Sequence, residues 1–181
     1  NVKETNPSLV DELVPGLMTM GDIQKVLSNL LVEGVSIRNL VAILEALADH
    51  ARSTRDINIL TEYVRQKLSR QLTKNYFPFG QAKVVTLEQS LENMLMEAID
   101  QNDNGTYLSI EPLKTQSILA SLAEAVRNLM QMGELPIVVT APIVRIYFKR
   151  MSAQAIPDLI VLSYNEIESD IDIQSAGMVS I

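Results

Sequence analysis

The chain contains 181 residues, 47% of them hydrophobic and 20% charged, a composition typical of one large globular domain or two small ones. It has no cysteine, which excludes disulfides and every metal or redox site that depends on a thiolate. Residues 1–76 hold nine basic and nine acidic residues, whereas residues 77–181 hold six and thirteen. The net charge of −7 therefore lies in the second part, and this excludes a protein that wraps nucleic acid.

The first part of the chain predicts four helices, because apolar residues recur there at spacings of three and four. Asn6 and Ser36 are the expected N-caps of the first and third helices, and Asp56 opens the fourth. Gly34 is expected to end the second helix in a left-handed conformation. The expected ranges are residues 7–14, 22–33, 37–52 and 56–74.

The run Tyr-Phe-Pro-Phe-Gly at residues 76–80 ends this helical pattern, since proline and glycine both break helices. We therefore divide the chain into a helical subdomain of residues 1–76, a linker of residues 77–81 and an α/β subdomain of residues 82–181.

Strands and helices alternate after the linker, which is typical of a small α/β layer structure. The predicted fold class is therefore mixed, with an N-terminal all-α subdomain followed by a small α/β subdomain. We expect strands at residues 82–87, 106–110, 136–140 and 159–163, helices at residues 88–101, 112–131 and 142–151, and a short last strand near residues 171–173 or 178–180.

Residues 100–111, from Asp100 to Glu111, match the spacing of an EF-hand calcium loop. The alternative is a polar turn between a helix and a strand. We favour the turn, because Leu108 has no side-chain oxygen at the ninth loop position and Pro112 stands where the exiting helix should be under way.

The remaining chemical motifs are weak. The single histidine, His50, lies near Asp49 and Ser53, but these three residues share one helical turn and no oxyanion loop accompanies them. Thr140 and Ala141 precede a helix start, a position that can hold an anion, yet no glycine allows close approach. The glutamates at positions 88, 92 and 97 are interpreted as a solvated helix face. We expect no enzymatic activity, no cofactor and no metal.

The fourth predicted helix has a basic outer side, made of Arg65, Lys67, Arg70 and Lys74. One interpretation is a solvated face. The other is docking onto an acidic surface, for which the acidic second half of a neighbouring copy is one candidate. Exposed ion pairs contribute about 0–1 kcal/mol each, so such contacts would set register rather than drive assembly.

Three segments resemble the C-terminal cytoplasmic part of the FHIPEP family of flagellar and type III secretion export gates. The first is GDIQKVLSNLLVEGVSIRNLVAILEALAD at residues 21–49, continued by residues 60–66. The others are LPIVVTAPIVR at residues 135–145 and IPDLIVLSYNEI at residues 156–167. The chain departs from the family pattern at Asn39, where an acidic residue is expected, and at Ala141, where serine is expected.

The resemblance implies the cytoplasmic docking and ring-forming part of a protein export gate. Its expected partners are export chaperones with their cargo, other export-apparatus proteins, and neighbouring copies in a nine-membered ring. The expected location is the cytoplasmic side of the bacterial inner membrane. The chain begins at Asn1 and lacks an apolar run of ~20 residues. Given the resemblance, we expect it to be a fragment of a longer protein whose membrane region lies upstream.

The resemblance also implies that ring contacts are made through the helical subdomain. The polar side chains of that subdomain are therefore the expected protein-contact residues: Arg38, Asn39, Glu45, Asp49, Arg65 and Arg70. The chaperone pocket is expected mostly in preceding subdomains. The competing hypothesis is a calcium-binding or enzymatic α/β module that uses residues 100–111.

Overall fold

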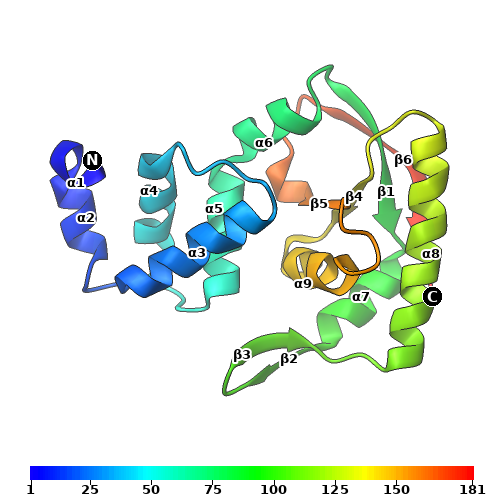
Figure 1. The fold of residues 1–181 in the computed structure, drawn as a ribbon, viewed down its shortest axis with the longest axis horizontal. Coiled ribbons are helices and arrows are strands. Elements are labelled where there is room, and N and C mark those ends of the chain that lie inside the picture. The colour runs from blue at the N-terminus through cyan, green and yellow to red at the C-terminus, as the bar shows by residue number, and fades with distance from the viewer. The chain divides into compact units, whose positions relative to one another are not determined.

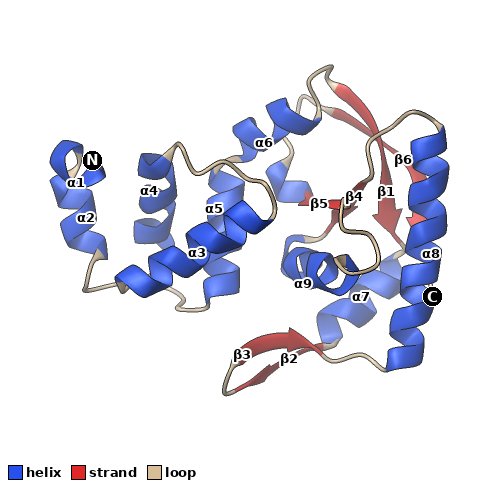
Figure 2. Cartoon of the chain, in the orientation of Figure 1, coloured by secondary structure: helices blue, strands red, loops and turns tan.

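The computed structural model describes the backbone of residues 1–181 and every side chain except that of Gln81. The chain forms two compact units, Asn1–Leu72 and Thr73–Ile181. In the described residues, strands occur only in the second unit (Figure 2). None of the described helices is both long enough and apolar enough to cross a membrane. A helical unit followed by an α/β unit confirms the predicted fold class.

The first unit is built from α-helices that bury one apolar stripe each. Their buried residues include Val26, Leu30, Leu47 and Leu60. Helix α4 packs against both α2 and α5, and α3 packs against α5. The helices are α1 (Val2–Thr5), α2 (Pro7–Leu13), α3 (Met20–Val32), α4 (Leu40–His50), α5 (Ile57–Lys67) and α6 (Ser69–Tyr76), the last of which continues into the second unit.

The helix ends follow from local chemistry. Thr19 and Asp22 form a reciprocal capping box at the start of α3, and Gly34 ends that helix at φ +72°, as predicted. The prediction that Ser36 caps the third helix is wrong. Asn39 is the cap, because its side-chain oxygen accepts the backbone amide of Ala42, and the helix therefore begins three residues later.

The single helix predicted for residues 56–74 is two helices. Leu68 separates α5 from α6, with φ −91° and ψ 14°, and its amide donates to the carbonyls of both Val64 and Arg65. Because a single non-helical residue turns the chain here without proline or glycine, the periodicity of the sequence does not reveal the break.

The second unit contains a four-stranded parallel sheet with the order β5-β4-β1-β6. The strands are β1 (Gln81–Leu87), β4 (Ile137–Thr140), β5 (Ile160–Ser163) and β6 (Asp172–Val179). Valines at positions 85, 138 and 161 point to one face of the sheet, and Val84, Val139 and Leu162 point to the other. This alternation buries both faces, as expected for a parallel sheet.

Three helices cover the first of these faces: α7 (Gln89–Glu97), α8 (Pro112–Gln131) and α9 (Pro142–Ser152). Figure 1 shows α8 running beside β1 and β6, with which it also makes contacts in the structure. The second face is covered by Phe77 and by residues of the connection from β5 to β6, which begins with the 3-10 turn η1 (Tyr164–Glu166).

Two elements of this unit differ from the sequence-based expectation. The predicted helix of residues 88–101 ends at Glu97, and its last residues instead form β2 (Ile99–Asn102), which pairs antiparallel with β3 (Gly105–Leu108). The predicted short last strand is the eight-residue β6, which pairs with β1 along its whole length.

Candidate functional site

The protein-contact residues predicted on the helical unit are mostly exposed. Arg38, Asn39, Glu45, Asp49 and Arg70 all lie on its surface. Arg65 does not. It is only 2% exposed, and its guanidinium lies 3.9 Å from the Glu33 carboxylate. The interpretation of Arg65 as part of a basic outer face is therefore wrong, because the side chain belongs to the packed interior.

Two of the exposed candidates have structural contacts of their own. Asn39 caps α4, and the Glu45 carboxylate lies 3.9 Å from the Lys67 ammonium, with both side chains about half exposed. Exposed pairs of this kind contribute at most about 1 kcal/mol. Within the described part of the chain, the side chains of Arg38, Asp49 and Arg70 make no hydrogen bond or ion pair, so these three are the candidates most available to a partner.

Glu92 is buried, which corrects its interpretation as part of a solvated face. It is 8% exposed, and its Oε2 accepts the backbone amide of Ala141 at 2.9 Å, at the start of α9. The helix start that the sequence singled out as an anion position is thus filled by a carboxylate of the same unit. Burial, and secondarily the charge of Glu92, raise the pKa of the half-exposed Tyr164 phenol.

A fully buried ion pair lies between α9 and the connection that leaves β5. Arg145 Nε is 3.4 Å from Glu166 Oε1, and both side chains are 0% exposed. Arg145 Nη1 also donates to the Val161 carbonyl at 3.1 Å, and Glu166 Oε2 accepts the Ser163 amide at 3.2 Å. Neither residue is among the functional residues predicted from the sequence. The available indication was an arginine inside the apolar run Val-Arg-Ile-Tyr-Phe, since a buried arginine needs an acidic partner.

Residues 100–111 form a β-hairpin rather than a calcium loop. Asp100 pairs with Tyr107 and Asn102 with Gly105 across the ladder, and Asn102 Oδ1 accepts the amide of Asn104 at 2.8 Å. Two paired strands cannot wrap their side-chain oxygens around one ion as an EF-hand loop does. Among the described residues, no group of three or more histidine or acidic side chains is arranged to hold a metal. The structure therefore does not support the calcium alternative.

His50 is engaged in packing. Its ring stacks on the ring of Tyr63 with centroids 3.7 Å apart and an angle of 2° between the planes. This contact packs the end of α4 against α5, so His50 has a structural role.

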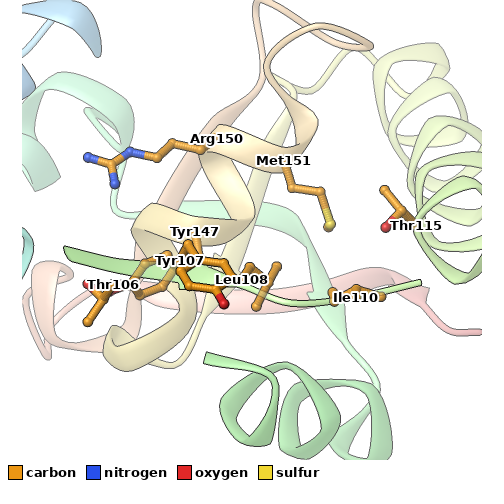
Figure 3. A pocket seen from close by; sticks show the side chains of 8 residues that line it. All are labelled: Thr106, Tyr107, Leu108, Ile110, Thr115, Tyr147, Arg150 and Met151. Carbon is orange, nitrogen blue, oxygen red and sulfur yellow. Dashed lines mark hydrogen bonds between the residues drawn. The ribbon is translucent and has the colours of Figure 1, made fainter. Parts of the chain in front are cut away.

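One pocket of about 430 Å³ opens in the second unit between the β2–β3 hairpin, α9 and the start of α8 (Figure 3). Tyr147 Oη donates to Thr106 Oγ1 at 2.6 Å and ties α9 to the hairpin. Figure 3 shows the guanidinium of Arg150 pointing away from Met151. The described lining contains no carboxylate and no histidine, and consists of Thr106, Tyr107, Leu108, Ile110, Thr115, Tyr147, Arg150 and Met151.

Comparison with known proteins gives a match over nearly the whole chain. The model of the FHIPEP family matches residues 1–172. Flagellar biosynthesis protein FlhA of Bacillus subtilis (strain 168) is 43% identical over 182 residues, which cover 100% of this chain and 27% of that protein. The chain thus spans about a quarter of the length of this curated relative.

Solved structures agree with this match. The nonameric EPEC SctV-C resembles the chain with a TM-score of 0.87 and 32% identity, over 98% of this chain and 53% of that one. CdsV of Chlamydia pneumoniae, in its complex with CdsO, gives a TM-score of 0.89 and 31% identity, over 98% of this chain and 52% of that one.

The fold is shared with the nonameric EscV cytosolic domain from the type III secretion system, with a TM-score of 0.83 and 32% identity over 99% of this chain and 53% of that one. The chain belongs to the FHIPEP family.

Proposed function

We propose that this chain is the ring-forming and docking part of the cytoplasmic region of a flagellar protein export gate. The observation that carries the proposal is the match of both units, over 98% of the chain, to a protein that forms a nonameric ring. A docking role is further supported by the surface, which offers exposed charged groups on the helical unit.

The proposed partners are neighbouring copies in a ring of nine, export chaperones carrying their cargo, and other components of the export apparatus. CdsV forms a complex with CdsO, which supports the last of these. The proposed location is the cytoplasmic side of the bacterial inner membrane, with the membrane region in another part of the full-length protein.

Within this function, Arg38 and Asp49 are the proposed contact residues on the helical unit. Both side chains are exposed and make no polar contact within the described part of the chain. Arg38 lies just before α4 and Asp49 in its last turn, so they mark the two ends of one helix. A neighbouring copy that contacts both residues would be held in one position along α4.

We therefore expect the double charge reversal Arg38→Glu and Asp49→Arg, made in the full-length protein, to lower secretion of cargo at least tenfold while leaving folding unchanged. Surface substitutions usually change stability by less than about 0.5 kcal/mol, so a loss of secretion would reflect lost contacts. Secreted cargo in the medium and protein abundance in the cell are the two measurements.

The reversal Lys3→Glu serves as the control, because Lys3 is also exposed but lies in the short helix α1. We expect it to secrete normally. If the double reversal also secreted normally at wild-type abundance, Arg38 and Asp49 would be solvated residues without a partner.

A further inference from the structure

The four-stranded sheet ends in β5 on one side, and the outer edge of this strand is closed. The amide of Ile160 donates to the carbonyl of the residue before β4 at 2.9 Å, so Val161 and Ser163 include the backbone groups that point away from β4. Side chains bind these groups. Arg145 Nη1 donates to the Val161 carbonyl at 3.1 Å, and Glu166 Oε2 accepts the Ser163 amide at 3.2 Å. No further strand can pair there.

The sheet ends in β6 on the other side, and the outer edge of that strand is open. The Asp172 amide donates to the Gly80 carbonyl at 3.0 Å, so Asp172 directs its backbone groups toward β1. Because the direction alternates along a strand, Ile173 and Ser175 direct their amides and carbonyls away from β1. Among the described residues, nothing bonds these outward backbone groups.

The open stretch is regular and exposed. Residues 172–175 pair one to one with residues 81–84 of β1, and the register shifts only after Ser175, where Ala176 is an extra residue on β6. The side chains of Asp172, Gln174 and Ser175 are all exposed. The stretch contains no lysine or proline, the residues that commonly protect an edge strand from pairing. It can therefore accept a further strand.

The surroundings of this edge are acidic. Residues 168–175 contain three acidic residues and no basic one, and Asp170 and Asp172 are both exposed. The paired residues 81–84 of β1 contain one cation, Lys83, which pairs with Gln174. Three carboxylates thus outnumber one ammonium group. The second unit as a whole has seven basic and thirteen acidic residues. An added strand that carries lysine or arginine is therefore favoured over an acidic one.

We propose that the open edge of β6 binds an extended, basic segment of a partner protein as an additional strand. The outward backbone groups of Ile173 and Ser175 bond the segment, and Asp170 and Asp172 attract its cationic side chains. In strand addition of this kind, the backbone hydrogen bonds supply affinity and the side chains supply specificity. The site lies within the second unit, so it does not depend on the ring of the proposed function.

The first test is binding of the acetylated peptide KVKVKV to the 181-residue chain, followed by amide hydrogen exchange in nuclear magnetic resonance spectra. We expect the peptide to slow exchange of the Ile173 and Ser175 amides at least tenfold. The acidic peptide EVEVEV should bind at least tenfold more weakly. Unchanged exchange at these two amides in millimolar KVKVKV would overturn the proposal, and equal binding of the two peptides would overturn its basic partner.

The second test removes one outward amide. Ser175→Pro deletes it without removing an amide that donates to β1, because proline is tolerated at the solvent side of an edge strand. Ser175→Ala is the matched control, since it keeps the amide and removes the same hydroxyl, which lies 2.7 Å from Thr86 Oγ1. We expect KVKVKV to bind the proline variant at least tenfold more weakly and the alanine variant as it binds wild type. Equal binding by both variants, with wild-type circular dichroism, would contradict strand addition.

The third test reverses a charge and does not depend on the proline variant. Asp172→Lys should weaken binding of KVKVKV at least threefold and strengthen binding of EVEVEV. Unchanged affinities for both peptides would overturn the role of the carboxylates. Exchange of the Ile173 and Ser175 amides that slows with rising protein concentration in the absence of peptide would show that a second copy occupies the edge, and this would overturn the assignment to a partner protein.

Discussion

Replacing Arg145 by leucine should lower the free energy of unfolding of the second unit by about 3–5 kcal/mol, the usual cost of removing one partner from a buried ion pair. The Glu166 carboxylate is 0% exposed and would lose the guanidinium 3.4 Å away, and the Val161 carbonyl would lose a hydrogen bond of 3.1 Å. Urea unfolding followed by far-ultraviolet circular dichroism measures this loss as a lower midpoint.

The companion variant carries leucine at both Arg145 and Glu166. It should recover most of the lost stability, because no uncompensated charge remains in the interior. Arg127→Leu is the matched control, since Arg127 is an exposed arginine of α8. An Arg145→Leu protein that unfolds at the wild-type urea concentration would show that the pair does not hold α9 to the β5–β6 connection.

Truncating Phe148 to alanine should cost about 3–5 kcal/mol, because the side chain is 0% exposed and packs in the core between α9 and the sheet. The loss combines the burial energy of the ring with the cavity that remains after it. The same urea titration measures this cost.

Phe79→Ala provides the comparison, because the chemical change is the same but the ring is exposed. It should change stability by less than about 0.5 kcal/mol. Equal losses in the two variants would mean that Phe79 is packed in the folded protein, and this would contradict the described fold.

The sequence predicted best those elements whose ends are marked by special residues. Helix α8 was predicted at residues 112–131 and runs from Pro112 to Gln131, because proline favours a first helical position and Gly133, at φ +83°, ends the helix. Strands β4 and β5 were recognisable as short apolar runs, since both of their faces are buried.

The misassigned elements show where local patterns are ambiguous. Residues 100–111 satisfy a calcium-loop spacing, yet they also contain Asn104–Gly105, a dipeptide typical of hairpin turns. The break at Leu68 and the late start of α4 depend on the backbone conformation of single residues. The spacing of the apolar residues would be the same if the helix continued through Leu68 or if α4 began earlier, so it does not reveal either feature.

Prediction of contact residues from the sequence fails where the tertiary structure buries a charged side chain. A helical periodicity distinguishes apolar from polar faces, so it assigned Arg65 and Glu92 to solvent. The structure buries both, with Arg65 near the Glu33 carboxylate and Glu92 accepting the Ala141 amide. A charged residue can enter the interior when a partner distant in sequence satisfies it, and no local pattern contains that partner.

The most direct test of the proposed export function is a chimera in which this chain replaces the corresponding segment of FlhA in Bacillus subtilis. The whole of this chain aligns with that segment at 43% identity. The measurement is the amount of flagellar cargo secreted into the medium, with Arg145→Leu in the same chimera as the folding-defective control. We predict that the chimera secretes cargo and that the control secretes at least tenfold less. A chimera present in the membrane at normal abundance that exports no cargo would contradict the assignment of this chain to the docking ring of a flagellar export gate.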